Sequence, residues 1–302
     1  MSAEGPRRAL RVAVALAVTA ASVVVLARVD RAAALRALSE THPLGLAAAL
    51  ALRVAQVAFR ALTWTLLLRP ADVSYRLGFA LIARTSLYSA VVGARAGDLL
   101  RAHALVDEAD VPLGLALGVT VLEKALSVAT LLAILGVTAA LSPLPPWVRA
   151  ASASLAAVGV AAVLALRVAG LVGGRFAVLR DASNALPRND FSRMAASTCS
   201  VTADWLAGIG AHLTLLRACG VDVSAAAAVL MQLSINAATS VPSAPLHLGA
   251  FELSVVWVLQ ALGAPTPRAL GYAFALHAVE LAAPLLAAAV ALVARRRERS
   301  CA

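Results

Sequence analysis

The chain has 302 residues, of which 61% are hydrophobic and only 14% charged, and its mean hydropathy is +0.86. This composition excludes a soluble globular domain and indicates a polytopic membrane protein. The formal net charge of +10 comes from arginines concentrated at the termini and in one loop. That distribution is typical of cytoplasmic anchoring beside anionic lipid, and no nucleic-acid-binding pattern accompanies it.

The first apolar run covers about 9–27 and follows three arginines. Because the run continues past any plausible cleavage point, an uncleaved signal anchor is favoured over a signal peptide. An amphipathic segment over 28–43 separates it from a second predicted spanning helix at about 44–68, which is long enough to cross a bilayer.

Polar side chains form a stripe on the second helix. Arg53, Gln56, Arg60 and Trp64 recur every three or four residues and therefore lie on one face. Two readings are open: the stripe contacts a lipid headgroup, or its side chains pair with acids on a neighbouring helix or extend to an interface.

The next apolar stretch is interrupted at Gly93-Ala-Arg-Ala-Gly97. An arm over 77–92 precedes this break, and Asp98 follows it at the start of a second arm of about nine residues. Nine helical residues rise about 14 Å, which is half the thickness of the bilayer core. The sequence therefore predicts a re-entrant hairpin whose turn contains Gly93 and Gly97.

Pro112 is predicted to begin a helix over 113–141 that holds Glu123 and Lys124 well inside its length. The proline-rich turn Ser142–Trp147 ends it. A helix at about 148–168 then leads into the most basic internal loop, over 167–193.

A further helix is expected at about 195–216. It places Asp204 and His212 on one face, where we favour contacts between helices over contacts with substrate. Cys199, Cys219 and Cys301 are widely spaced, so neither a disulfide framework nor a metal site is expected.

A second broken hairpin is predicted around Ser240–Glu252, between arms at about 225–239 and 253–262. An unwound turn with ionisable residues at membrane depth is tolerated only where it lines a protein-enclosed or water-filled cavity. We therefore expect function here. The turn residues are Pro242, Pro245, His247 and Gly249.

His247 either lies at the interface or titrates near neutral pH and couples proton movement to transport. The last predicted helix, about 269–293, contains His277 and Glu280, which lie one turn apart and can pair with each other.

The expected fold is an all-α polytopic membrane protein with about six full transmembrane helices and two re-entrant hairpins, or eight helical segments if each hairpin counts once. Both termini and the 167–193 loop are predicted to be cytoplasmic, because basic residues gather on that side of the membrane. This topology puts the arginines of 28–43 outside, which violates the same rule. The order helix, helix, hairpin, helix occurs in 1–146 and again in 147–302. A single transmembrane domain built as an inverted repeat is therefore predicted.

The run Val92-Gly-Ala-Arg-Ala-Gly-Asp-Leu-Leu-Arg101, followed by Glu123-Lys124 and by a turn ending in Phe251-Glu252, resembles the flippase-like transmembrane domain of lysylphosphatidylglycerol synthases. The resemblance covers about 10–293. Members of this family typically have a proline and a glycine–glutamate pair ahead of the arginine in the first motif. Gly93 and Asp98 stand in their places here, and Lys124 replaces a usual arginine. Charge is kept at both positions.

The resemblance implies movement of a lipid or lipid-linked headgroup across the cytoplasmic membrane. In bifunctional relatives a soluble aminoacyltransferase domain follows the membrane domain, whereas this chain ends at Ala302, after the last helix. We therefore expect no synthesis of lysyl-lipid and no enzymatic activity.

Charged side chains in these spans need partners, because an isolated charge at a helix centre costs roughly 2.5–3.5 kcal/mol. Asp98 is expected to meet Arg101, one turn away, and Glu123 to face Arg101 or Arg95. Glu252 or Glu280 is expected to face Arg53 or Arg60. Asp98 and Glu252 are expected to approach each other across a common cavity. The candidate substrate contacts are Arg53, Arg60, Asp98, Arg101, Glu123, Lys124, Glu252, His277 and Glu280.

Three functions fit these patterns. The first is a flippase or facilitator, driven by a gradient or by consumption of its product, since the chain has no nucleotide-binding loop. The second is a non-transporting membrane partner of a separately encoded glycosyltransferase or lipid synthase. The third and least favoured is a lipid-modifying enzyme. A membrane lipid or lipid-linked molecule is the expected partner, without nucleic acid, metal or cofactor.

Overall fold

The computed structural model describes residues 31–68, 71–92, 94–142, 146, 150, 153–154, 157, 161, 191–240 and 250–301. Outside these residues lie the predicted helix at 9–27, most of the predicted helix at 148–168, and the basic loop as far as residue 190. The predicted turn residues Gly93, Pro242, Pro245, His247 and Gly249 also lie outside them.

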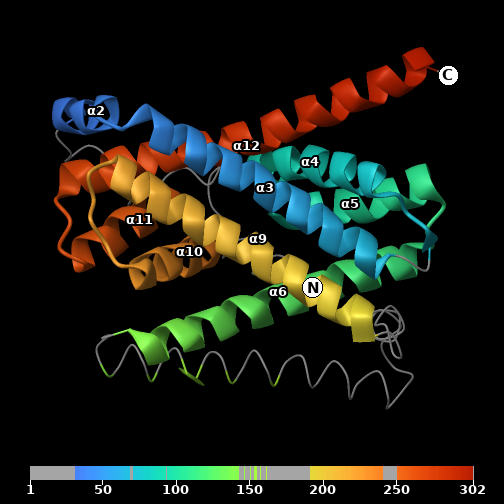
Figure 1. Ribbon diagram of the computed structural model, residues 1–302, viewed down its shortest axis with the longest axis horizontal. Coiled ribbons are helices and arrows are strands. Elements are labelled where there is room, and N and C mark those ends of the chain that lie inside the picture. Colours follow the sequence, from blue (N-terminus) through green and yellow to red (C-terminus); the bar gives the residue numbers. More distant parts are fainter. Residues whose placement is uncertain are drawn as a thin grey trace, which may run out of the picture. The chain divides into compact units, whose positions relative to one another are not determined.

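The described part of the chain is helical and contains no strand, which confirms the all-α class. Within the described residues, three segments are long and apolar enough to cross a membrane: Pro43–Leu67, Leu113–Leu141 and Thr266–Ala294. The number of crossings and the inverted repeat stay predictions. The helices in Figure 1 are α2 (Arg31–Ser39), α3 (Pro43–Leu67), α4 (Tyr75–Val92), α5 (Ala94–Ala109), α6 (Leu113–Leu141), α9 (Phe191–Ala218), α10 (Ala225–Ser240), α11 (Ala250–Ala261) and α12 (Thr266–Cys301).

The first predicted break is narrower than the sequence indicated. Only residue 93 separates α4 from α5, and Gly97 lies inside α5. The predicted arm of about nine residues is therefore wrong: α5 has 16 residues and rises about 24 Å. The physical reason is that one glycine costs a helix only about 1 kcal/mol, while its alanine, leucine and arginine neighbours favour the helix.

Two helix ends are fixed by glycine. Gly220 after α9 has φ +67° and Gly263 after α11 has φ +85°, in the left-handed region that glycine adopts without strain. Beyond them, Val221 N donates to Leu216 O at 2.9 Å and Ala264 N donates to Leu259 O at 2.9 Å. Both ends are Schellman caps, which satisfy carbonyls that would otherwise lack donors.

The chain divides into two compact units. Unit 1 comprises Met1–Ala51, Leu87–Ala96 and Ile209–Ala282, and unit 2 comprises Leu52–Ser86, Gly97–Gly208 and Ala283–Ala302. The predicted single domain with halves 1–146 and 147–302 stays a prediction.

The core of unit 2 draws on α3, α4, α5, α6 and α12. Trp64, Leu81, Leu105, Val119 and Ala287 are all fully buried in one cluster. Figure 1 shows α4 and α5 running beside one another in this unit. Their contact brings the start of α5, with its charged side chains, against α3 and α6.

In unit 1, α10 packs against α11. The buried side chains include Leu215 of α9, Met231 of α10, Leu259 of α11 and Tyr272 of α12. The core of this unit is therefore apolar, apart from the few polar side chains that meet within it.

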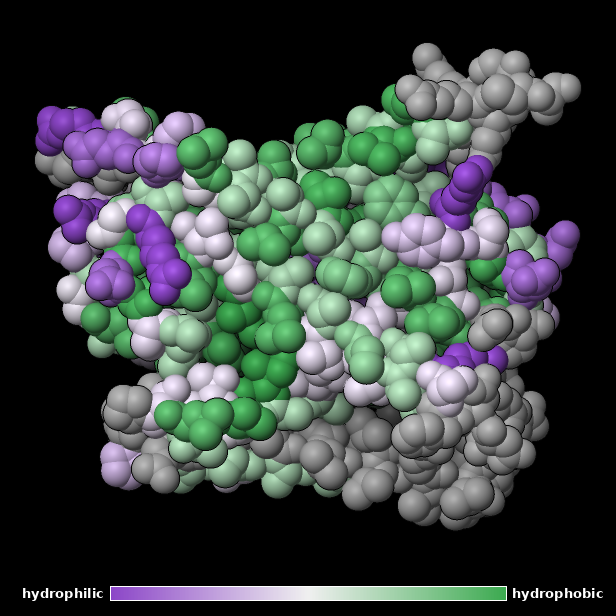
Figure 2. Space-filling model, viewed as in Figure 1, coloured by the Kyte–Doolittle hydropathy of each residue, from purple (hydrophilic) through white to green (hydrophobic). Residues whose placement is uncertain are grey.

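Large apolar side chains are exposed on several helices, among them Leu141, Trp257 and Leu285. Figure 2 shows that apolar residues cover much of the visible described surface and that hydrophilic ones gather in separate patches. Exposed apolar area of this extent marks contact with another apolar phase. Together with the three candidate spans, it indicates a membrane protein.

Gly45 permits close packing of α3 against the end of α9 in unit 1. A Cβ atom at Gly45 would lie 2.5 Å from Ala218 Cβ, and His42 N donates to Ala218 O at 3.0 Å just beside it. Because Ala218 has no flexible side chain to move aside, any larger residue would push the helices apart.

We expect Gly45→Ala to destabilise the purified protein by about 1–3 kcal/mol, because overpacking of a tight contact has this cost. Thermal unfolding in detergent measures the effect. Ala47→Val, which adds bulk at an exposed position of the same helix, is the matched control. Equal unfolding temperatures for wild type and Gly45→Ala would contradict the tight contact.

Candidate functional site

Seven charged side chains from four helices gather within unit 2, and we refer to them as the charged cluster. α3, α5, α6 and α9 supply them. Ion pairs and hydrogen bonds join them in two groups, one around Arg101 and one around Asp204. The members are Arg53, Arg60, Asp98, Arg101, Glu123, Lys124 and Asp204.

Arg101 lies at the centre of the cluster with only 2% of its surface exposed. Its guanidinium is 3.5 Å from Asp98 Oδ1, one turn earlier on α5, and 3.6 Å from Glu123 Oε2 on α6. These distances confirm the expected Asp98–Arg101 pair and the expected approach of Glu123 to Arg101. The prediction rested on i,i+3 spacing and on the need to pair buried charge.

Two uncharged side chains complete the surroundings of Arg101. Its Nε donates to Thr85 Oγ1 of α4 at 3.4 Å, and the guanidinium carbon lies 5.1 Å from the ring centroid of Trp64 on α3. Stacking on an aromatic ring is favourable for a guanidinium, and more so when it is desolvated. The arginine is thus held by helices on several sides.

Glu123 and Lys124 differ sharply in exposure. Glu123 is 3% exposed, whereas 47% of the Lys124 side chain is exposed. Lys124 Nζ lies 3.4 Å from Asp98 Oδ1 and 4.0 Å from Glu123 Oε2. The two carboxylates therefore each contact both Arg101 and Lys124, and the four charges form a closed ring.

The ring is loosely bonded. Arg101 Nη1 and Glu123 Oε2 are both buried and make no hydrogen bond, because the 3.6 Å between them exceeds hydrogen-bond length. Charge-assisted bonds of this type usually measure 2.7–2.9 Å. Arg101 accordingly retains a donor, and Glu123 an acceptor, for a further group.

The polar stripe on α3 meets α9. Arg60 Nη2 is 3.6 Å from Asp204 Oδ2, and Gln56 Nε2 donates to the Asp204 backbone oxygen at 2.9 Å. Arg53 Nη1 donates in turn to Gln56 Oε1 at 2.6 Å. The structure thus shows the second reading of the stripe for Arg60, a pair with an acid on a neighbouring helix.

The charged cluster has a formal excess of positive charge. Its four cations, Arg53, Arg60, Arg101 and Lys124, accompany three carboxylates, those of Asp98, Glu123 and Asp204. With every group ionised, four minus three leaves +1 in a mainly buried setting. Asp98, Glu123, Arg101 and Lys124 balance two against two, so the formal excess lies on the side of Arg53 and Arg60.

Histidines make two contacts between helices within the described part of unit 1. His277 Nδ1 of α12 lies 2.6 Å from Glu252 Oε1 of α11, and the Phe251 ring is 4.9 Å from the His277 ring. His212 Nδ1 of α9 lies 2.7 Å from the Tyr272 hydroxyl of α12, and both residues are fully buried.

The structure adds partners that the sequence did not indicate. α11 brings the Glu252 carboxylate directly to His277 Nδ1, so His277 pairs with an acid on the neighbouring helix. Arg60 pairs with Asp204 of α9, and the expected approach of Glu252 or Glu280 to Arg53 or Arg60 stays a prediction. Asp204 and His212 both bond between helices, which supports the packing role expected for them.

The two described cysteine side chains are free. Cys199 is exposed, and Cys219 is buried just after α9. Burial raises the pKa of the Cys219 thiol, so it stays protonated at neutral pH and packs 3.6 Å from Thr41 Oγ1. Among the described residues, no three His, Cys, Asp or Glu side chains are grouped to hold a metal ion.

Comparison with protein families gives one match. The family described as the lysylphosphatidylglycerol synthase TM region matches residues 9–288. The chain belongs to this family. Neither curated proteins nor solved structures gave a match. The matched range contains every residue of the charged cluster and also the Glu252–His277 pair.

Membership in the lysylphosphatidylglycerol synthase TM family confirms the family resemblance that was inferred from Val92–Arg101, Glu123-Lys124 and Phe251-Glu252. The contributions of Thr85 and Tyr272 were missed by sequence reasoning. Both lie in apolar helices without a spacing pattern that singles them out. The available signal is chemical: a buried hydroxyl in an apolar helix needs a hydrogen-bond partner.

We expect Arg101→Ala to destabilise the protein by about 3–5 kcal/mol, because it leaves Glu123 buried without its main counter-charge. The double variant Arg101→Met, Glu123→Gln should recover most of that loss, since no unpaired charge remains. Thermal unfolding in detergent measures both.

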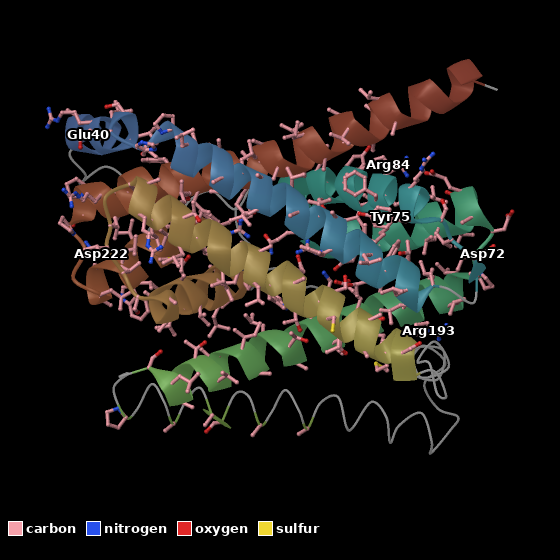
Figure 3. All side chains as sticks on the ribbon, in the orientation of Figure 1. Glu40, Asp72, Tyr75, Arg84, Arg193 and Asp222 are labelled. Carbon is pink, nitrogen blue, oxygen red and sulfur yellow. The ribbon has the colours of Figure 1, made fainter. Side chains whose placement is uncertain are left out.

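Arg84→Ala is the control for this series. Arg84, labelled in Figure 3, pairs with Glu108 of α5, and both side chains are partly exposed. Its loss should cost about 1 kcal/mol or less. If the Arg101→Ala and Arg84→Ala variants unfold at the same temperature, the buried ring contributes no more to the free energy of unfolding than the exposed Arg84–Glu108 pair.

Proposed function

We propose that this member of the lysylphosphatidylglycerol synthase TM family moves a phosphate-bearing lipid or lipid-linked headgroup across the cytoplasmic membrane and catalyses no reaction. The single observation that carries the proposal is the charged cluster. Seven ionisable side chains are costly to keep between apolar helices, and their loose pairing is a poor solution for stability alone.

The cations of the ring favour an anionic headgroup. A phosphate adjacent to Arg101 and Lys124 would meet two cationic donors. Arginine binds phosphate oxygens with two parallel donors, and lysine adds a compact point charge. Lys124, which is nearly half exposed, is the group that first meets an incoming headgroup.

If the carboxylates of the ring exchanged Arg101 for Lys124 as their partner, the ring could open and no carboxylate would be left without a cation. When a phosphate takes donors of Arg101, Glu123 still has Lys124 at 4.0 Å, and Asp98 has Lys124 at 3.4 Å. Each carboxylate therefore keeps a cation throughout. Release of the headgroup restores the original pairs at little cost, as a transport cycle requires.

Exposed apolar side chains occur in the same turn of α5 as Asp98 and Arg101. Leu99 and Leu100 of α5, between Asp98 and Arg101 in sequence, are both exposed. These leucines provide an apolar path for acyl or prenyl chains while the headgroup occupies the charged cluster. Both parts of an amphiphilic substrate thus find matching surfaces on one short stretch.

The function is tested with purified protein in phosphatidylcholine vesicles that contain a fluorescent phosphatidylglycerol or a fluorescent neutral glycolipid. We expect wild type to equilibrate the anionic probe between leaflets faster than the neutral one, as read by dithionite quenching. Lys124→Gln should slow the anionic probe about tenfold, because a charge-assisted hydrogen bond contributes about 1.5–3 kcal/mol.

Arg84→Gln removes the same charge from an exposed pair and should leave the rate unchanged. Equal wild-type rates for both probes would contradict headgroup recognition by charge. Absence of any movement would sink the transport proposal and favour the other reading, a non-transporting partner of a separate glycosyltransferase or lipid synthase.

We also propose the topology of six full spans and two hairpins with both termini cytoplasmic, supported by the distribution of arginine. In a Cys199→Ser, Cys219→Ser background, Cys301 is the single thiol. A membrane-impermeant maleimide should label it in inverted membrane vesicles and not in intact spheroplasts. Labelling in spheroplasts would reverse the assignment.

A further inference from the structure

The Glu252–His277 pair differs in kind from the charged cluster. In unit 2, the carboxylates of Asp98, Glu123 and Asp204 contact arginine or lysine, whose charge is fixed at physiological pH. In unit 1, Glu252 shares a hydrogen bond with a histidine. Histidine is the side chain whose unperturbed titration falls near neutral pH.

We propose that Glu252 and His277 form a proton-binding site, which takes up and releases one proton in each transport cycle. The site goes beyond the proposed function, on which its coupling role rests: lipid movement would then draw on a proton gradient. Intramembrane acid–histidine pairs are the kind of group that proton relays use.

The geometry suits transfer of a proton. His277 Nδ1 and Glu252 Oε1 are 2.6 Å apart, within the range of a short charge-assisted hydrogen bond. The His277 side chain is 11% exposed and that of Glu252 only 4%. The imidazole therefore retains limited access to the surroundings, and the centroid of the Phe251 ring lies 4.9 Å from that of the imidazole.

The charge of the pair changes by one unit. With one proton between Nδ1 and Oε1, the imidazole is neutral, the glutamate is a carboxylate, and the pair carries −1. Uptake of a second proton at Nε2 gives imidazolium beside carboxylate, with a net charge of zero. A change of net charge inside a membrane protein shifts its conformational equilibrium and responds to the proton gradient.

Few other ionisable groups belong to the helices around the pair. α10, which packs on α11, contains no Asp, Glu, Lys, Arg or His, and Glu252 is the only such residue in α11. Glu280 lies one turn beyond His277 on α12. From α9 comes His212, whose ring is bonded to the Tyr272 hydroxyl of α12.

Two arginines of unit 1 that the structure describes lie at helix ends. Arg268 Nη1 of α12 donates to Gly220 O just after α9 at 2.9 Å, and Arg217 lies in the last turn of α9. Glu280 is therefore the acid whose titration the experiments must separate from that of the pair.

Infrared difference spectroscopy tests whether the Glu252–His277 pair binds a proton, and it needs no lipid substrate. Wild type in phosphatidylcholine vesicles, stepped from pH 8 to pH 5.5, should show imidazole and carboxylate bands that are absent in Glu252→Gln and in His277→Asn. Glu280→Gln and the exposed Asp222→Asn should keep those bands. Identical difference spectra in wild type and both pair variants would overturn the proposal.

Coupling is tested with the fluorescent phosphatidylglycerol vesicles under a gradient of two pH units. In wild type, the ratio of movement rates with and without the gradient should be about fivefold or more. This ratio should fall to one in Glu252→Gln and His277→Asn and stay at the wild-type value in Asp222→Asn, whichever way the absolute rates change.

The two proposals fail differently. If wild type moves the lipid at the same rate with and without the gradient, the proton role is overturned and the transport function stands. If no lipid moves under any condition while the infrared bands appear, the transport function and its coupling fail, and the site remains a proton-binding pair.

Discussion

The burial of Arg101 is the constraint on which unit 2 depends. A guanidinium cannot lose its proton in a protein, so its charge must be met by neighbours wherever the helix takes it. Asp98, Glu123 and the Trp64 ring meet it here, from three helices. Their convergence fixes how α3, α5 and α6 pack, and the loose bonds that result leave donors and acceptors within reach of a further ion.

The two units treat ionisable groups in opposite ways. The charged cluster pairs carboxylates with arginine and lysine, and we propose that it binds an anionic headgroup. The Glu252–His277 pair joins a carboxylate to an imidazole, and we propose that it binds a proton. A membrane protein that had only the first could recognise a headgroup, but it would have no means of drawing on an ion gradient.

Sequence reasoning predicted what depends on local spacing and on the cost of unpaired charge. The helix at 113–141 matches α6, because a proline marks its start and a proline-rich turn its end. The Asp98–Arg101 pair follows from i,i+3 geometry. Pairs between helices were harder: His277 has an acid one turn away on its own helix, yet α11 supplies another. Only tertiary packing decides between them, as it decides that Asp204 meets Arg60.

Exposed Leu99 and Leu100 lie between Asp98 and Arg101, within a single turn of α5. A lipid held at this turn would present its headgroup to charge and its first methylenes to leucine, while the remainder of each chain stays outside the protein. The protein would then distinguish lipids by their glycerophosphate end and not by the length or unsaturation of their acyl chains. Cells that remodel their fatty acids with temperature would keep the same set of transportable lipids.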